Sequence, residues 1–437
     1  MILFKSFKNI FLISELRKKI FFTLGVLIID RLGTYIPVLG VNVPLLGEYM
    51  KQATNLGAFF SYLDTFSGSA LGKCTLFALG ISPYITASIM MQLLGMSIPS
   101  LEQLLKEGEF GRKVINQYTR YLTLGLSIFY SFSYALFLES QGLALTPGWA
   151  FRIMFVISLS AGAMFVMWLG EQISLFGIGN GASMIIFAGI VSRFPEHVAR
   201  TIYSIELGTI SSFTALLILF IFILIVACVV FLEKGERKIP VQYARRIMGN
   251  KIYGGQSTFI PFKINTAGVM PVIFASALLQ IPLSVVAMLS TRFTSLKFLS
   301  EAFTVGGALF NSLEFILIIF FTFFYTALIF NPDELADNMK KNGGFIPGIR
   351  PGKSTAQFFD YILTRIGLVG ALYLATLSII PNIITPILKM PFYLGGTSLL
   401  ICVGVALETF SQIEAYLIEH RYEGFLASGK LKNRVAR

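Results

Sequence analysis

Long apolar runs alternate with short polar gaps along the whole chain of 437 residues. A helix needs about 20 apolar residues to cross the hydrocarbon core of a bilayer, and about ten runs approach or reach that length. The pattern therefore predicts an all-α polytopic membrane protein. The expected spans cover residues 20–38, 74–96, 121–138, 152–170, 182–194, 212–232, 268–289, 313–331, 366–388 and 393–417.

A nine-residue phrase occurs twice within these runs: GISPYITAS starts at Gly80 and GVMPVIFAS starts at Gly268. Each copy is expected inside an apolar helix, in the second span of a five-span half. An odd number of spans inverts the following half, and inverted halves place a shared pathway at their interface. We therefore expect two halves, residues 1–205 and 206–437. The alternative is chance similarity between two membrane helices that contain Gly and Pro.

Composition and charge agree with a membrane protein and give its orientation. Residues of the AVILMFWYC set make up 55% of the chain and charged residues 13%, about half the charged fraction usual in soluble proteins. The N-terminus has scattered charges and no small-residue cleavage site, so no removable signal peptide is predicted. With both termini inside, the inner segments hold 26 of the 35 Lys and Arg residues. That excess places both termini in the cytoplasm.

Two of the inner connections are long, polar and basic, from about residue 233 to 262 and from about 331 to 365. Clusters of Gly and Pro in both predict defined turns. One interpretation is attraction to anionic lipid, which is worth about 1 kcal/mol per basic residue near the surface. Lipid attraction requires charge but no defined shape, so we expect these loops to bind a partner. A basic tail follows the last span.

The segment from Leu56 to Lys73 is only moderately apolar and is interrupted by Gly57, Gly68 and Gly72. It is too polar to cross the membrane alone. One interpretation is a half-helix that re-enters the membrane, which requires protein or a water-filled cavity around it. The other is an amphipathic helix on the outer surface. The residues alone leave both interpretations open.

The central parts of the spans are nearly free of charge, unlike those of secondary transporters. The repeated phrase carries Ile81, Ile85 and Ile273 instead. Along a pathway, such side chains would form a hydrophobic constriction that resists ions by dewetting; the alternative is ordinary helix packing. HExxH, GxSxG and GxxxxGK[ST] do not occur, so no enzyme, catalytic site or cofactor is predicted. Three isolated cysteines and two histidines support neither a metal site nor a disulfide framework.

Five strings along the chain are specific enough to indicate a family: KEGEFGRKVINQYTRY (106–121), WLGEQISLFGIGNGAS (168–183), IPVQYARR (239–246), FNPDELADNMKKNGGFIPGIRPG (330–352) and GGTSLLI (395–401). They closely resemble the SecY family, the central channel subunit of the bacterial protein-export translocon. The resemblance covers essentially the whole chain. It implies ten transmembrane helices in two inverted five-helix halves around a central hourglass pore. Such a channel opens toward lipid between helices 2 and 3 on one side and helices 7 and 8 on the other.

The resemblance also implies the roles of particular residues. The pore would narrow at a ring of apolar side chains: Ile81, Ile85, Ile186, Ile190, Ile273 and Ile401. Residues from about 59 to 73 would form the plug, a re-entrant half-helix that seals the outer funnel, and its expected site residues are Phe60, Leu63, Phe66, Ser67 and Gly68. The two basic loops would dock the ribosome and the SecA motor, with contacts from Arg245, Arg246, Lys251 and Arg350.

The function implied by the resemblance is a protein-conducting channel in the bacterial cytoplasmic membrane. It would translocate unfolded secretory polypeptides and release membrane helices sideways into lipid. The implied partners are SecE, SecG, SecA, the ribosome with its RNA and proteins, signal sequences and nascent polypeptides, and membrane lipids. The chain has no nucleotide-binding motif, so a partner must supply the energy. The competing class is a secondary transporter of the same inverted architecture, which charged or hydrogen-bonding residues near the midplane would favour.

Overall fold

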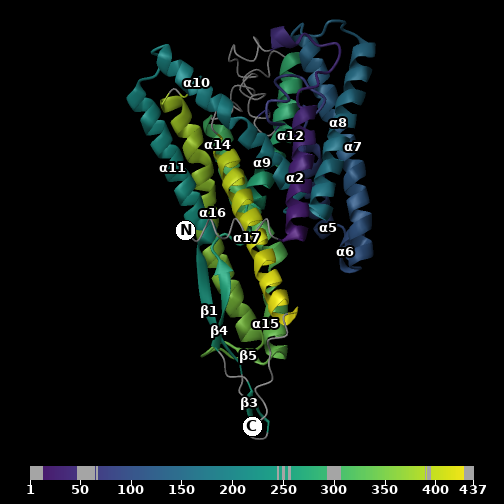
Figure 1. The fold of residues 1–437 in the computed structure, drawn as a ribbon. Coiled ribbons are helices and arrows are strands. Elements are labelled where there is room, and N and C mark those ends of the chain that lie inside the picture. Colours follow the sequence, from purple (N-terminus) through teal and green to yellow (C-terminus); the bar gives the residue numbers. More distant parts are fainter. Residues whose placement is uncertain are drawn as a thin grey trace. The chain divides into compact units, whose positions relative to one another are not determined.

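The structure is a computed structural model that describes residues 13–46, 64, 67–243, 246–248, 251–253, 257–292, 307–388, 390 and 395–427. Most of the elements drawn in Figure 1 are helices. The chain divides into two compact units. Unit 1 consists of residues 1–196, 283–300 and 405–437, and unit 2 of residues 197–282 and 301–404. The predicted boundary between halves at residue 205 stays a prediction.

Unit 1 is a bundle of helices. Its members are α2 (Ser14–Gly33), α5 (Ser82–Ser97), α6 (Pro99–Lys106), α7 (Glu109–Ser140), α8 (Trp149–Phe176) and α9 (Gly181–Ser192). Helix α7 packs against both α5 and α8, and α2 packs against α8 and α9 (Figure 1). The C-terminal part of α17 (Gly396–Ala427) joins this unit, where the backbone N–H of Gly179 donates a hydrogen bond to Gln412 Oε1 at 3.0 Å. The GIGNG string (177–181) is thus an interhelical turn, and it also contacts the last helix.

Unit 2 combines long helices with a small sheet. Its helices are most of α10 (Phe194–Glu206), α11 (Ser212–Lys234), the first part of α12 (Met270–Arg292), α14 (Ala308–Ile329), α15 (Pro332–Lys341), α16 (Lys353–Ile387) and the start of α17. Helix α16 packs along α14 and also contacts α11 and α15. In Figure 1 the strands lie together at one end of α11 and α16.

The first basic connection is a β-ribbon, which the sequence analysis did not predict. Strand β1 (Glu236–Tyr243) pairs antiparallel with β4 (Ser257–Lys263). Two short strands, β2 (Arg246–Met248) and β3 (Lys251–Tyr253), follow β1 and precede β4 in the chain. They pair with each other. Strand β5 (Gly344–Phe345), from the second basic connection, pairs with the end of β1, so the order is β4-β1-β5. The two connections therefore share one three-stranded sheet, and β2 and β3 form a separate two-stranded sheet.

Six helical stretches in the described part are long and apolar enough to cross a membrane. They are residues 109–140, 149–176, 212–234, 308–341, 353–385 and 396–419. The other four expected spans correspond to α2, α5, α9 and α12. Helix α9 has 12 residues and so extends about 18 Å, less than the bilayer core of about 30 Å. Helices α7 and α16 begin about a dozen residues before the apolar runs, because the polar sequence there is also compatible with helix.

The two copies of the repeated phrase have the same local structure. Gly80 and Gly268 have positive φ angles of 53° and 63°, and α5 and α12 begin two residues later. Pro83 and Pro271 then lie in the first turn of their helices. Proline is tolerated there because a backbone N–H in the first turn has no hydrogen-bond acceptor within the helix. The expectation that each copy lies inside a helix is therefore wrong, since each copy starts its helix. The shared geometry favours a true repeat over chance similarity.

Candidate functional site

Four of the isoleucines expected in the pore ring belong to unit 1. Ile81 is the N-cap of α5, Ile85 lies in its first turn, and Ile186 and Ile190 are one turn apart on α9. Ile85 is half-buried and the other three are buried. A Cβ on Gly170 of α8 would lie 3.0 Å from Ile81 Cδ1. Because Gly170 has no side chain, the start of α5 packs closely on α8.

The other two isoleucines of the expected ring belong to unit 2. Ile273 lies in the first turn of α12, where its N–H donates a hydrogen bond to Val269 O at 3.2 Å. Ile401 lies on α17 and is fully buried. All six positions thus carry branched aliphatic side chains on helices or at a helix start. Their closure into one ring stays a prediction.

Several residues in and directly after the expected plug are buried by protein. Asp64, Ser67, Leu71 and Cys74 are all buried. The hydroxyl of Tyr134 on α7 donates a hydrogen bond to Leu71 O at 2.9 Å. An amphipathic helix on the outer surface would expose one face, so this burial favours re-entry. Of the plug residues expected from the sequence, Phe60, Leu63 and Phe66 lie outside the described residues.

The expected half-helix does not extend through residue 73. From Gly68 onward the chain forms turns, and Gly68 and Ser69 have φ angles of 66° and 71°. An L-residue with positive φ does not continue a right-handed helix. Cys74 also has a positive φ, of 49°, so the helix of the second span begins only at Ser82.

Ser67 and Gly68 lie beside the elements that carry ring isoleucines. A Cβ on Gly68 would be 3.0 Å from the Cα of Gly189 and would overlap Nη1 of Arg31. A Cβ on Gly80 would be 3.7 Å from the Cα of Ser67. Gly189 directly precedes Ile190, and Gly80 directly precedes Ile81. The segment is therefore seated against the chain at two of the expected ring positions.

The two basic connections, expected from the sequence to be separate loops, share one hydrophobic core. Phe262 on β4 and Phe359 on α16 are among its largest members, with ring centroids 5.6 Å apart. The buried residues of this core, called the loop core below, are Ile239, Val241, Phe262, Ala336, Met339, Ile346, Ala356, Phe359, Ile362 and Leu363. The alternation of Ile239 and Val241 along β1 is a strand pattern that could have revealed it.

Of the expected docking residues, Arg350 lies between Ile346 and Ala356 of the loop core. Arg350 is exposed in the turn before α16, and its carbonyl oxygen accepts a hydrogen bond from Thr355 Oγ1 at 2.9 Å. Arg246 and Lys251 lie on β2 and β3, at the end of the ribbon that is farthest from the helices of unit 2 (Figure 1). Arg245 lies outside the described residues.

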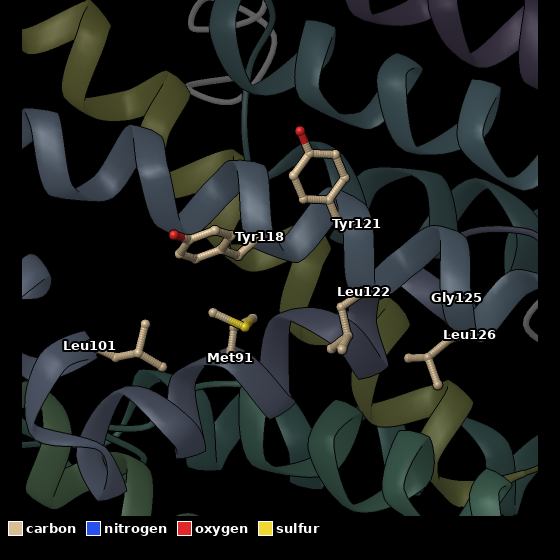
Figure 2. A pocket seen from close by; sticks show the side chains of 7 residues that line it. All are labelled: Met91, Leu101, Tyr118, Tyr121, Leu122, Gly125 and Leu126. Atoms are coloured by element: carbon tan, nitrogen blue, oxygen red, sulfur yellow. The ribbon is translucent and has the colours of Figure 1, made fainter.

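An open apolar groove of about 560 Å³ lies between α5, α6 and α7. Figure 2 shows Met91, Tyr118 and Leu122 grouped around it, with Leu101 and Leu126 at its two ends. A Cβ on Gly125, which also borders the groove, would meet no atom within 4 Å, so this glycine keeps the space open. No sequence pattern predicts this groove, because its walls come from three helices.

A buried carboxyl that the sequence analysis overlooked lies on α14. Glu314 is fully buried and accepts hydrogen bonds from Ser378 Oγ at 3.1 Å and from Asn382 Nδ2 at 3.2 Å, both on α16. Acidic groups within membrane helices are costly and need such partners. These hydrogen bonds of Glu314 stabilise the packing of α14 against α16 within unit 2. Its signal in the sequence was a single Glu inside a long apolar run.

Comparison with known sequences gives a consistent result over nearly the whole chain. The sequence model of the SecY family matches residues 75–410. The protein translocase subunit SecY of Aquifex aeolicus is 45% identical over 426 residues, which cover 96% of this chain and 98% of that protein. The subunit of Escherichia coli strain K12 is 44% identical and covers 96% of each chain. The subunit of Thermotoga maritima is 40% identical over 442 residues, 99% of this chain and 100% of that one.

Comparison with solved structures agrees with the sequence matches. A structure described as a protein conducting channel matches with a TM-score of 0.67 at 20% identity, covering 91% of this chain and 92% of that one. A structure on the plug domain of SecY, described as stabilising the closed channel, matches with a TM-score of 0.64 at 18% identity and the same coverage. Sec61 in a canine ribosome-channel complex matches at 0.61 and 20% identity. At these identities the structures show a shared fold.

Proposed function

This chain belongs to the SecY family and is a protein-conducting channel subunit of a protein translocase, and from that premise we propose how its parts conduct polypeptide. Unfolded secretory chains pass through a constriction formed by the isoleucine ring, and membrane helices leave sideways into lipid. The family is one of channel subunits rather than enzymes, so the energy comes from a partner, the SecA motor or the ribosome.

The observation that carries the proposal is the chemistry of the six ring positions. Each is an isoleucine, and Ile81, Ile85 and Ile273 belong to the repeated phrase that starts α5 and α12 in the same way. Flexible aliphatic side chains yield to a passing residue of any type because they offer it no fixed charge or hydrogen bond. Without a chain in place, such a constriction resists ions by dewetting.

The segment of residues 59–73 is the proposed seal above the ring. The seating of Ser67 and Gly68 against Gly80 and Gly189 supports this role, because it places the segment beside ring residues of α5 and α9. The burial of Leu71 and Cys74 supports it as well. Displacement of the segment would open the funnel to cargo.

The groove between α5, α6 and α7 is the proposed binding site for apolar side chains of a signal sequence. The family resemblance assigns α5 and α7 to one side of the lateral opening. The groove is lined almost entirely by apolar atoms, and each buried methylene of a cargo contributes roughly 0.8 kcal/mol. A signal sequence is then selected by its hydrophobicity rather than by a sequence code.

The sheet and helices around the loop core are the proposed docking platform for the ribosome and SecA. Arg350 is exposed on it, and Arg246 and Lys251 lie on the ribbon. Basic side chains there could bind ribosomal RNA phosphate or acidic patches of the motor, and the RNA contact would weaken with salt. SecE and SecG complete the proposed complex. The excess of inner Lys and Arg supports a cytoplasmic-membrane location with both termini in the cytoplasm.

Crosslinking of a cargo stalled in transit tests this proposal. A photoreactive residue at position 186, 190, 273 or 401 should crosslink to the stalled chain in reconstituted membranes. Ile218 on α11 provides the matched control, because it is a buried isoleucine outside the ring, and a probe there should give no adduct. Equal crosslinking from position 218 and the ring positions would contradict the proposed pathway.

A further inference from the structure

A buried ion pair joins the plug segment to α9. Oδ2 of Asp64 lies 3.4 Å from Nη2 of Arg193, and the two side chains are only 10% and 11% exposed. Arg193 is the C-cap residue of α9, directly after the turn that carries Ile190. The contact therefore connects a residue of the plug to the end of a ring-bearing helix.

The other oxygen of Asp64 organises the plug segment itself. Oδ1 accepts hydrogen bonds from the backbone N–H of Gly72 at 2.9 Å and from Ser67 Oγ at 3.2 Å. Ser67 Oγ in turn accepts a hydrogen bond from the N–H of Leu71 at 3.2 Å. Asp64 thus holds the local turns with one oxygen and reaches α9 with the other.

A second arginine, Arg31, lies beside the same plug segment. Arg31 of α2 donates a hydrogen bond from Nη1 to Ser192 Oγ at 3.2 Å and forms an ion pair with Asp30, with Nη2 2.6 Å from Oδ2. Nη1 also lies where a Cβ on Gly68 would be. Asp30 compensates Arg31, whereas Asp64, on the plug segment itself, is a carboxylate that faces Arg193.

We propose that the Asp64–Arg193 ion pair is a charge latch that holds the plug in its seat on α9. The proposal rests on the assignment of residues 59–73 as the plug. The pair positions the plug and does not contact the conducted chain. It makes the closed channel dependent on an electrostatic contact in addition to packing.

The expected effect of breaking the latch follows from the burial of both charges. Removal of one partner leaves the other buried without this counter-charge for as long as the plug stays seated. Displacement of the plug would return that charge to water. A single neutral substitution should therefore shift the equilibrium toward the displaced plug by more than about tenfold, since loss of one partner of a buried pair is strongly destabilising.

The test measures ion conductance of the reconstituted complex in planar bilayers without cargo. Asp64→Asn is the most selective change, because the amide oxygen can still accept the hydrogen bonds from Gly72 and Ser67 while the charge is lost. Arg193→Gln removes the opposite charge. Each single variant should leak, whereas the double variant should leak less than the sum, because it removes both charges of the pair together. Glu139→Gln is the matched control, since it breaks the Glu139–Arg152 pair elsewhere in unit 1.

A second measurement, the labelling rate of a cysteine on the plug segment, is needed because a variant that folds poorly could conduct poorly for that reason alone. Ala70→Cys, at a fully buried position of the plug segment whose side chain takes no part in the Asp64 network, serves as the reporter in a background without the native cysteines. It should react with an outside, membrane-impermeant maleimide at least about tenfold faster once Asp64 is neutralised, by the same shift in equilibrium. Leak and labelling equal to the parent in both single variants would overturn the latch. A double variant whose leak is the sum of the two would overturn it as well.

A plug deletion separates this inference from the function on which it rests. Removal of residues 60–70 should leak if the segment is the seal at all. If the deletion leaks and Asp64→Asn matches the parent, the latch is wrong and the plug assignment stands. If the deletion does not leak, the plug assignment fails, and the latch fails with it.

Discussion

The rings of Phe262 on β4 and Phe359 on α16 lie with their centroids 5.6 Å apart, and this contact ties the β-ribbon to the helix that follows the second basic connection. Both side chains are buried in the loop core. Two segments that lie far apart in the chain therefore pack against one another. The proposed docking platform is a packed structure rather than a pair of separate loops.

Phe359→Ala should loosen this platform. Loss of a buried Phe typically costs about 3–5 kcal/mol, and here the cavity would lie between the ribbon and α16. We expect faster proteolysis within residues 236–263 and weaker binding of ribosome or motor, with the membrane helices still inserted. Phe259→Ala on the same strand is the control, because Phe259 is 58% exposed, and it should leave the proteolysis rate unchanged.

Replacement of Ile186, Ile190 and Ile273 by Ser should raise ion leak through the purified complex. Hydroxyls would let water and ions wet the constriction, which isoleucine prevents. Single-channel recording in planar bilayers measures the effect. Ile218→Ser on α11 is the control for the effect of burying a hydroxyl outside the ring, and this variant should not raise the ion leak. Unchanged conductance of the triple variant would count against the ring.

Gly68→Ala should unseat the plug without any change in charge. A Cβ there would overlap Nη1 of Arg31 and approach Gly189, and the φ of 66° is itself unfavourable for alanine. The expected result is a leak in the absence of cargo. Gly25→Ala on α2 is the matched substitution, because its Cβ would meet no atom within 4 Å, and it should behave like the parent. A channel that stays tight in the Gly68→Ala variant would place the seal elsewhere.

Arg350→Glu should block motor-dependent export while the protein remains inserted and folded. The side chain is exposed, so the reversal changes the docking surface and leaves the loop core intact. Export of a secretory cargo into proteoliposomes measures the effect. Arg112→Glu reverses an exposed charge on α7 and controls for net charge. Normal export by the Arg350 variant would remove this residue from the docking site.

Gly125→Leu should fill the groove between α5, α6 and α7. The glycine borders open space, so the larger side chain enters the groove without disturbing the helix contacts around it. Crosslinking of a signal sequence to position 91 should fall, and export of cargoes with weakly apolar signals should fall most. Gly25→Leu adds the same bulk on α2 and should change neither. Full crosslinking with the groove filled would place signal binding elsewhere.

Several features could be read from the sequence because they depend on neighbouring residues. The apolar runs predicted most spans, and the family strings predicted the family. The same reasoning failed at the start of α5, where the run from Cys74 reads as continuous helix. The positive φ angles of Cys74 and Gly80 interrupt it, and hydropathy does not report backbone conformation.

By itself the sequence determined that this is a membrane channel subunit of the SecY family, approximately where most of its spans lie and where its basic loops lie. Hydrophobic periodicity and charge bias are local quantities, so each can be read within about 20 residues. Only the tertiary structure decided that the two basic loops share a core, that Glu314 has partners on α16, and that Asp64 faces Arg193 from 129 positions away in the chain. Such pairings depend on how distant helices pack, and packing brings together side chains whose separation in sequence carries no signal of contact.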